Sequence, residues 1–312
     1  MEAKAVVATR FGGPEVLEFR SVDAGQGEVL VRQSAVGVNY IDVYVRTGEY
    51  PMIQPPAALG MEAAGVVVES SSPGFRRGDR VAYACPPPGA YATMRALPAK
   101  DLVVLPDYVS DEIAAAVMLK GMTAEYLLHR TYRVRPGDTV LVHAAAGGVG
   151  LLLCQWAKSL GARVIGTVSS EAKAELARAH GCDQVIVSRD YRFASQMHSK
   201  ADVIYDGIGQ AAAKENYEAL AMRGHWVSYG HASGALDNVN LGAKSGTLSR
   251  PVIFHYTEDR RLLLEMAGNV FAALRDGTIR VDAIRRYPLA AAADAHRDLE
   301  ARRTSGQIVL LP

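Results

Sequence analysis

The first hundred residues alternate short apolar runs with glycine and proline turns, a pattern typical of β-strands. The turn GGP at residues 12–14 separates two such runs, and PPPG at residues 86–89 is a rigid loop in which no strand continues. We therefore predict a β-rich barrel or sandwich whose strands lie at residues 4–9, 16–19, 28–38, 65–69 and 80–83.

After about residue 110 the pattern changes to alternating helices and strands. Ser110 is placed to cap a helix that begins at Asp111, and a second helix is expected at residues 123–129. Because apolar strands and helices then follow one another, we predict a doubly wound parallel sheet of the Rossmann type. The further elements expected are strands at residues 139–145, 163–168, 184–187, 203–205, 226–229 and 307–311, and helices at residues 149–160, 171–180 and 258–275.

The glycine-rich sequence AAAGGVG at residues 144–150 leads from the first of these strands into a helix. It fits Ala-x-x-Gly-x-x-Gly, a variant of the dinucleotide fingerprint. Small residues let the backbone approach a pyrophosphate, and the helix N-terminus offers N–H groups and partial positive charge. A tight turn without a ligand is the alternative, which three glycines and three alanines in seven positions disfavour. We predict a phosphate cradle made of Ala146, Gly147, Gly148, Val149 and Gly150.

The residue that follows the second strand of this sheet indicates which coenzyme binds. Sites for NADH carry Asp or Glu there, whereas this chain has Ser169, with Lys173 in the next helix and Arg189 after the next strand. A hydroxyl accepts a 2′-phosphate without repulsion, and a cation neutralises its charge. We therefore predict NADPH as the coenzyme. Ser169 or Ser170 also fits the role of a helix cap beside a solvated Lys173, and both roles can hold together.

Composition narrows the class of protein. With 312 residues, 49% of them hydrophobic, and a net charge of +1, the chain suffices for about two domains, and its scattered charges argue against a nucleic-acid partner. The start MEAKAVV is too short and too charged for a signal peptide, and the apolar stretches are interrupted, so no membrane span is expected. Cys85, Cys154 and Cys182 form no CxxC pair, which indicates reduced, mostly buried thiols in a cytoplasmic protein.

No metal site is expected. The eight histidines are dispersed, no four cysteines are clustered as a structural zinc requires, and His143, inside an apolar strand, fits a hydrogen-bonded core residue. A hydride-transfer enzyme without a metal polarises its acceptor by hydrogen bonds or uses an acceptor that is already electrophilic. The substrates expected are therefore quinones and activated enones or enals.

Several segments together resemble one family. With the glycine loop, they are similar to the quinone oxidoreductase (zeta-crystallin-like) branch of the zinc-free medium-chain dehydrogenase/reductase family. The segments are FGGPEVL at residues 11–17, GVNYIDVY at 37–44, LGMEAAG at 59–65, MLKGMTA at 118–124 and FHY at 254–256.

The resemblance implies a Rossmann domain at residues 123–258 inserted into a GroES-like β-rich domain made of residues 1–122 and 259–312. Zinc-containing relatives have a cysteine at the position of Asn39 and a histidine at that of Met61, and another ligand falls near Lys120. The resemblance therefore also implies catalysis without a metal.

The resemblance also implies roles for residues near the substrate. Asn39, Asp42 and Tyr44 match the active-site segment, and Tyr50 matches a tyrosine at the mouth of the pocket. Each residue fits a simpler role too, because Asn39 can satisfy backbone groups at a turn, Asp42 can pair with Arg46, and the two tyrosines can pack in the core.

On the coenzyme side, Lys173 matches the lysine that binds the 2′-phosphate. Arg302 matches a C-terminal arginine that reaches the cofactor, a part that Arg303 can take instead. The loop that begins with Tyr229 and Gly230 resembles the one that lies along the nicotinamide.

One departure from the family concerns the adenosine end. Relatives carry an Asn-Tyr pair where this chain has Ser188 and Arg189, so Arg189 or Tyr191 is expected to replace the missing tyrosine.

We interpret the chain as an NADPH-dependent quinone reductase, with hydrogen bonds to the substrate from Asn39 and Tyr44 and protonation by water or Tyr44. The alternatives are an NADPH-dependent alkenal or enone double-bond reductase and a non-catalytic NADPH-binding, crystallin-like or RNA-associated protein. The absence of a basic stripe disfavours RNA. The resemblance implies a homodimer, and residues 251–256 are either its pairing edge or a buried strand.

Overall fold

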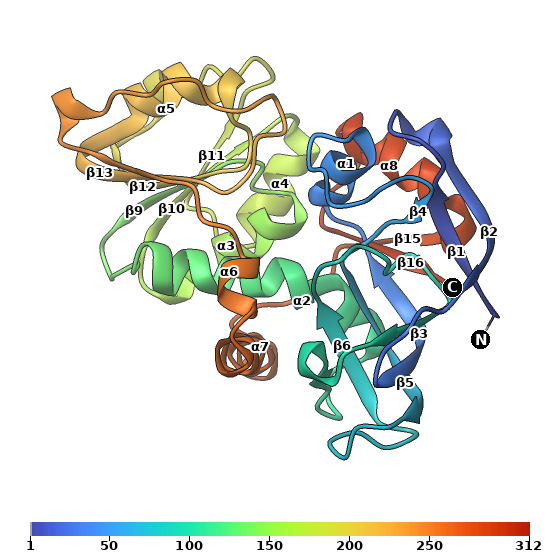
Figure 1. Ribbon diagram of the computed structural model, residues 1–312. Helices are drawn as coiled ribbons and strands as arrows, with labels where there is room; N and C mark the ends of the chain where they lie inside the picture. The colour runs from blue at the N-terminus through green and yellow to red at the C-terminus, as the bar shows by residue number, and fades with distance from the viewer. Residues whose placement is uncertain (1) are drawn as a thin grey trace. The chain divides into compact units, whose positions relative to one another are not determined.

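The computed structural model describes residues 2–312, and the chain forms two compact units (Figure 1). The first unit comprises the chain up to Met122 together with Phe254–Arg275 and Val281–Pro312. The second comprises Thr123–Ile253 with Asp276–Arg280. The N-terminal and C-terminal parts of the chain therefore fold together, and the second unit is inserted between them.

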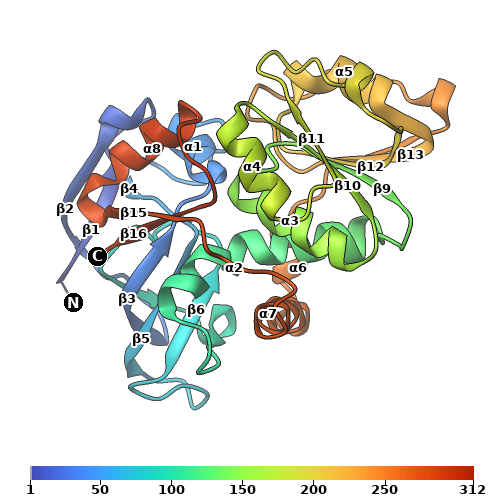
Figure 2. The same cartoon turned by 180° about the vertical axis from the view of Figure 1, so that it is seen from behind.

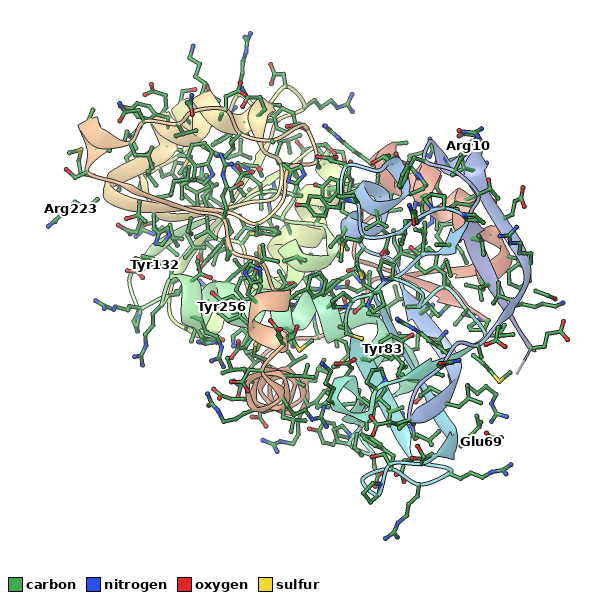
Figure 3. All side chains as sticks on the ribbon, in the orientation of Figure 1. Arg10, Glu69, Tyr83, Tyr132, Arg223 and Tyr256 are labelled. Atoms are coloured by element: carbon green, nitrogen blue, oxygen red, sulfur yellow. The ribbon has the colours of Figure 1, made fainter. Side chains whose placement is uncertain are left out.

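Two sheets form the β-rich part of the first unit. The smaller has the strand order β2-β1-β4 and the larger β15-β16-β3-β5-β6-β8, with β7 paired to β3. Along β3, Val29 and Val31 are fully buried whereas Arg32 is exposed, as expected for a sheet with one face on the core. Tyr83 on β6 is also fully buried, whereas Glu69 on β5 is exposed (Figure 3). The strands are β1 (Glu2–Ala8), β2 (Leu17–Asp23), β3 (Val29–Gly37), β4 (Ala57–Ala58), β5 (Glu62–Ser70), β6 (Arg80–Ala84), β7 (Met94–Leu97), β8 (Val103–Val104), β15 (Ile284–Pro288) and β16 (Gln307–Leu311).

Helices complete the first unit. Helix α7 buries Leu263, Met266 and Val270, which share one helical face. Helix α2, which continues into the second unit, approaches α7 closely because Gly121 has no side chain: a Cβ there would lie 2.8 Å from Val270 Cγ1. The helices are α1 (Tyr40–Thr47), α2 (Asp111–Tyr126), α6 (Phe254–Thr257), α7 (Arg260–Arg275) and α8 (Ala292–Glu300), with 3-10 turns at Pro14–Val16, Ala99–Asp101 and Leu289–Ala291.

The second unit contains a six-stranded sheet with the order β11-β10-β9-β12-β13-β14, in which all neighbouring strands are parallel. Helices α3 and α4 pack on β9, β10 and β11, and α5 packs on β13 (Figure 2). The predicted doubly wound sheet is confirmed. Its strands are β9 (Thr139–Val142), β10 (Arg163–Val168), β11 (Gln184–Val187), β12 (Ala201–Asp206), β13 (Leu220–Ser228) and β14 (Thr247–Ser249), its helices are α3 (Gly148–Ser159), α4 (Glu171–Ala179) and α5 (Ala213–Ala219), and shorter turns lie at Leu127–Thr131, Ala194–Gln196, Gln210–Ala212 and Gly242–Lys244.

Two predicted elements are wrong. Residues 123–129 are not a separate helix, because α2 runs through Gly121 to Tyr126 before the π-helical turn Leu127–Thr131. Residues 251–256 are not a strand, because α6 begins at Phe254 and the outermost strand of the parallel sheet is β14. Pro251, which has no N–H to donate, follows closely on β14 and disfavours further pairing.

The three cysteines agree with the prediction made from the sequence. Cys85, Cys154 and Cys182 are all buried free thiols, as predicted. Among residues 2–312, no helix is long and apolar enough to cross a membrane.

Candidate functional site

The segment that contains Asn39 and Asp42 starts helix α1. Asn39 precedes the helix in an extended conformation, and its backbone N–H donates a hydrogen bond of 2.8 Å to Asp42 Oδ2. This bond caps the helix and lets a segment rich in β-branched and aromatic residues, which favour strands, turn into a helix. Gly48 ends the helix with a φ of 84°, a conformation that suits glycine.

The side chain of Asn39 is anchored on a buried carboxylate. Asn39 Nδ2 donates to Glu62 Oε1 at 2.8 Å, Lys120 Nζ lies 2.5 Å from the same oxygen, and the Leu119 N–H donates to Glu62 Oε2 at 2.6 Å. Glu62 is fully buried, so these donors replace the water that the carboxylate has lost. A Cβ at Gly37 would lie 2.2 Å from Glu62 Oε1, so only glycine fits beside the cluster. Sequence reasoning did not single out Glu62.

The cluster does not fit a zinc ion. Of the positions that match zinc ligands in relatives, Asn39 points its amide at Glu62, Met61 is fully buried, and Lys120 places a cation on that carboxylate. A second cation beside the ammonium group would be repelled. Within residues 2–312, no group of three or more His, Cys, Asp or Glu side chains is arranged to hold a metal ion.

Asp42 is a buried carboxyl with a raised pKa. Besides the Asn39 N–H, Asp42 Oδ2 accepts a hydrogen bond of 2.9 Å from Tyr91 Oη, while Oδ1 is buried without a partner among the described residues. Burial raises the pKa of Asp42 to about 7, against the lowering effect of these two hydrogen bonds and of Lys120. The alternative that Asp42 pairs with Arg46 is wrong, because the Arg46 guanidinium binds Glu300 at 2.8 Å.

Tyr44 and Tyr50 belong to a cluster of three aromatic rings that meet edge-on or tilted. The ring of buried Tyr44 lies 5.2 Å from that of Tyr40 and 5.1 Å from that of Tyr50, centroid to centroid. The backbone also joins them, since the Tyr50 N–H donates to the Tyr44 carbonyl at 3.0 Å. Burial, and then the charge of Glu49, raises the pKa of Tyr50. Tyr40, four residues before Tyr44, was missed, although its spacing was the available signal.

The glycine loop forms a cradle between β9 and α3. Ala144 adopts a φ of 48°, and its carbonyl accepts the Gly147 N–H at 2.7 Å. A Cβ at Gly150 would lie 2.2 Å from the Ala144 oxygen, and no side chain caps α3 at Gly147. The first turn of α3 therefore presents only backbone and small side chains, which fits a bound diphosphate.

The ends of β10 and β11 bring together the residues predicted to select the coenzyme. Ser170 Oγ caps α4 by accepting the Lys173 N–H at 3.4 Å, as the alternative interpretation expected. Exposed Arg189 donates through Nε to the Ser169 carbonyl at 3.2 Å. Tyr191 packs against the apolar core of the sheet, which leaves Arg189 as the better replacement for the missing tyrosine.

Tyr229 and Gly230 follow β13 directly, beside the end of β12. Their N–H groups donate to the Asp206 carbonyl at 2.9 and 3.3 Å, and burial raises the pKa of Tyr229. The buried Asp206 carboxylate accepts the N–H groups of Ile208 and Gly209 at 2.7 and 3.1 Å. Asp206 therefore fixes the loop after β12 and the loop after β13. Sequence reasoning missed Asp206, although an acid at the end of an apolar strand could have indicated it.

His143 is confirmed as a hydrogen-bonded core residue. Its ring nitrogens lie 2.7 Å from Thr167 Oγ1 and 2.6 Å from Asn216 Oδ1. Because the Asn216 amide donates to Asp206 Oδ2 at 3.0 Å, His143 ties the ends of β9 and β10 to the Asp206 loop. Burial lowers the pKa of His143.

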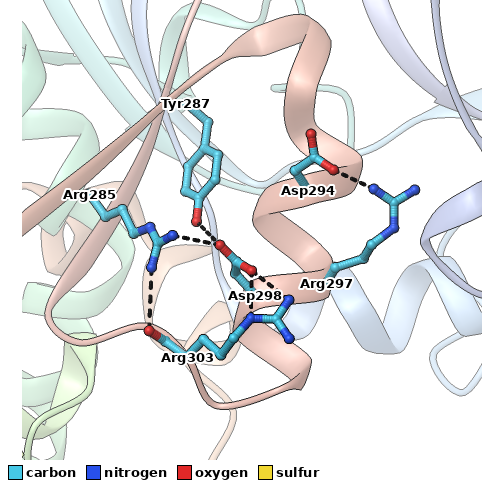
Figure 4. Close-up of polar contacts among 6 residues, drawn as sticks. All are labelled: Arg285, Tyr287, Asp294, Arg297, Asp298 and Arg303. Atoms are coloured by element: carbon cyan, nitrogen blue, oxygen red, sulfur yellow. Dashed lines mark hydrogen bonds and ion pairs between the residues drawn. The ribbon is translucent and has the colours of Figure 1, made fainter.

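The C-terminal arginines differ in their surroundings. Arg303 donates through Nε and Nη2 to Asp298 Oδ1 at 2.9 and 2.6 Å, and Arg285 and Tyr287 bind the other oxygen of this carboxylate (Figure 4). Arg302 is exposed and has a φ of 56°, a conformation that non-glycine residues rarely adopt. Arg303 is thus held by Asp298, whereas the part predicted for Arg302 stays a prediction.

The predicted residues thus fall into two groups. Asn39, Asp42, Tyr44 and Tyr50 are neighbours around α1, and Arg302 belongs to the same unit after α8. The predicted coenzyme residues of the second unit all follow strands β9, β10, β11 and β13, at the carboxyl edge of the parallel sheet. Such an edge is where doubly wound sheets bind ligands.

Two family models match parts of the chain, and known relatives match nearly all of it. The alcohol dehydrogenase GroES-like domain model matches residues 25–134, and the zinc-binding dehydrogenase model matches residues 148–267. A quinone oxidoreductase of Pseudomonas aeruginosa is 46% identical over 99% of this chain and all of its own length. A 2-haloacrylate reductase of a Burkholderia species is 41% identical over 99% of this chain and 98% of its own.

A solved structure shows the same fold. Escherichia coli quinone oxidoreductase, complexed with NADPH, superposes with a TM-score of 0.95 at 39% identity, over 99% of this chain and 100% of that one.

Proposed function

The chain belongs to the quinone oxidoreductase branch of the medium-chain dehydrogenase/reductase family, and from this premise we propose that it is an NADPH-dependent quinone reductase that needs no metal. The observation that carries the proposal is the cradle at Gly147–Gly150 followed, one strand on, by Ser169 in place of a carboxylate. The proposal needs no zinc, because Met61 stands where zinc-containing relatives have a histidine and Lys120, near another expected ligand, places its ammonium group on Glu62.

The second unit would hold the coenzyme. The first turn of α3 would hold the diphosphate, and Ser169, Lys173 and Arg189 would offer hydroxyl and cationic groups to the 2′-phosphate. The family resemblance alone gives Arg302 a part in reaching the coenzyme. Tyr229 and Gly230, held by Asp206, line the nicotinamide half.

The first unit would supply the groups that meet the quinone. When bound, NADPH provides the hydride, and a proton completes the reduction of the quinone to a hydroquinone. Glu62 fixes the direction of the Asn39 amide, which leaves its second N–H to polarise a quinone oxygen. The ring of Tyr44, packed between those of Tyr40 and Tyr50, shapes an apolar wall, and its hydroxyl or a water molecule delivers the proton. Most of the acceleration comes from positioning.

The proposal is tested by stopped-flow NADPH oxidation with 1,4-benzoquinone and 9,10-phenanthrenequinone. Oxidation well above the enzyme-free rate is expected, with NADPH preferred over NADH. No oxidation above that rate would refute the quinone reductase. Asn39→Ala should lower kcat about 10- to 100-fold while coenzyme binding is retained.

A second candidate function is reduction of an activated carbon–carbon double bond, which the similarity to a 2-haloacrylate reductase favours. An electrophilic alkene needs the same hydride donor and the same polarising amide. Turnover on an α,β-unsaturated aldehyde that exceeds turnover on both quinones would replace the first function by this one.

We also propose a cytoplasmic homodimer. Strand β14, at the edge of the parallel sheet, is the element that would pair with a second copy, in place of residues 251–256. A mass near twice 33.4 kDa in sedimentation velocity is the expected result.

A further inference from the structure

Behind Asp42 lies a row of buried polar side chains that the proposed reaction does not use. Tyr91 Oη lies 3.0 Å from His296 Nε2, and His296 Nδ1 lies 3.0 Å from Arg46 Nη1. Arg46 then forms two hydrogen bonds of 2.8 Å with Glu300, which is partly exposed. Tyr91, His296 and Arg46 are fully buried, and all five residues of the row belong to the first unit.

Arg46 sets the direction of every hydrogen bond in the row. A guanidinium group has donors only, so His296 Nδ1 must accept and His296 Nε2 must carry the hydrogen. Tyr91 Oη accepts that hydrogen, and its own single hydrogen is then left for Asp42 Oδ2, 2.9 Å away. Burial and the charge of Arg46 lower the pKa of His296 to about 3, so the ring stays neutral in this arrangement.

The row is therefore an anchor and not a proton channel. A proton would have to leave Arg46, whose guanidinium does not release one, or pass through His296, whose Nδ1 is occupied. What the row does is hold the Tyr91 hydroxyl on Asp42, so that Oδ2 always has two donors, Tyr91 and the Asn39 N–H.

From this geometry, and resting on the proposed function, we propose that Tyr91 and His296 are positioning residues, which hold the Asp42 carboxylate against the Asn39 backbone and so orient the Asn39 amide for quinone reduction. Asn39 is tied at both ends, by its N–H to Asp42 and by its side chain to Glu62. The loss of either tie would let the amide turn.

The proposal predicts a pH dependence with a definite sign. The groups that face Asp42 are Tyr91, the Asn39 N–H, Lys120 on α2 and Glu62 on β5. A hydrogen bond to the charged form lowers the pKa of an acid, so removing the Tyr91 hydroxyl raises that of Asp42 above about 7. Because the ionised carboxylate is the better acceptor for both donors, kcat should rise with pH through this range.

The test compares Tyr91→Phe with the matched variant Tyr287→Phe. Tyr287 Oη also donates to an aspartate, Asp298, at 2.6 Å, but that aspartate is held by Arg285 and Arg303 as well (Figure 4). Tyr91→Phe should lower kcat for quinone about tenfold at pH 7 with little change in KM, and move the midpoint of the kcat–pH profile upward. Tyr287→Phe should leave both unchanged.

Further variants distinguish the positioning role of Tyr91 and His296 from a general loss of stability. His296→Gln retains an acceptor for Arg46 and a donor for Tyr91 and should keep most of the activity, whereas His296→Leu should behave like Tyr91→Phe. In an Asp42→Asn background, Tyr91→Phe should cause no further loss of kcat. A wild-type profile for folded Tyr91→Phe, or a full additional loss in that background, would overturn the proposal.

A readout without turnover separates this proposal from the proposed function. The titration of the Asp42 carboxyl carbon, followed by NMR, should shift upward in Tyr91→Phe and not in Tyr287→Phe. If the wild-type chain oxidises no NADPH with quinones, the proposed function fails while this titration still reports on the row. If the titration does not shift, the row does not act on Asp42.

Discussion

At the scale of single residues, the buried acids of the first unit differ in what surrounds them. Glu62 has a lysine on its carboxylate, whereas Asp42 has only neutral donors and one oxygen without a partner among the described residues. Sequence reasoning found Asp42 through the resemblance but missed Glu62, Tyr91 and His296. Their importance depends on contacts between residues far apart in the chain, and no local pattern encodes such contacts.

The raised pKa of Asp42 predicts that its charge destabilises the fold at neutral and higher pH. In the unfolded chain the carboxyl loses its proton near pH 4, whereas in the folded chain it does so at about 7. The folded state therefore holds the extra proton between these values, and stability falls as pH rises through them, by about 4 kcal/mol in total. Asp42→Asn should thus gain about 3 kcal/mol over wild type between pH 5 and pH 8.

The measurement is the free energy of unfolding from urea titrations at both pH values. Asp298→Asn is the matched control, because its surrounding arginines and tyrosine lower the pKa of Asp298 and it is ionised throughout this range. Its difference from wild type should not change between pH 5 and pH 8. An Asp42→Asn variant whose difference from wild type is equally constant would contradict the raised pKa.

At the scale of elements, regular patterns were predictable and local exceptions were not. The strands at residues 184–187 and 307–311 coincide with β11 and β16, because apolar β-branched runs lie between clear stop signals. Helix α1 was not predicted, since residues 40–47 (YIDVYVRT) favour a strand. The feature that favours the helix is the capping hydrogen bond from the Asn39 N–H to the Asp42 carboxylate. Helix α6 was mistaken for a strand for the same kind of reason, because its four residues are too few to show a period.

The close packing of the glycine loop predicts how a substitution at Gly150 changes NADPH affinity. Gly150→Ala places a Cβ 2.2 Å from the Ala144 carbonyl, a backbone atom that cannot move without shifting the loop. We expect NADPH affinity to fall at least tenfold, measured by fluorescence titration of the nicotinamide, because the amides of the first turn of α3 lose their alignment. Gly268→Ala is the control: it lies on α7 with open space around it and should bind NADPH normally, and it should stabilise the chain by about 0.5–1 kcal/mol.

At the scale of the whole molecule, the plan of one unit inserted into another followed from family resemblance and not from periodicity. A β-rich beginning, an alternating middle and a β-like tail are visible in the sequence, but nothing local says that the two ends fold together. The pairing of β16 with β3, in which Val309 lies opposite Gly37 and Leu310 opposite Val36, is what joins the two ends of the chain in the first unit. The coenzyme class, by contrast, could be predicted from a few residues. A carboxylate after β10 would repel a 2′-phosphate, and this chain has none there.

The preference for NADPH over NADH should therefore be measurable as a difference in thermal stability of the chain, without any substrate. A ligand that binds only the folded state stabilises it by RT ln(1 + [L]/Kd), which is about 2.7 kcal/mol at a hundredfold excess over Kd. At equal concentrations NADPH should raise the melting temperature more than NADH, since the charge of Lys173 acts on the 2′-phosphate alone. Lys173→Ala should remove most of this difference and leave the NADH shift intact. Arg178→Ala, on the same helix but paired loosely with Glu171, should preserve the difference. An equal shift with both coenzymes in the wild-type chain would mean that Ser169 and Lys173 serve only the start of α4, and the NADPH assignment would fall even if quinones were reduced.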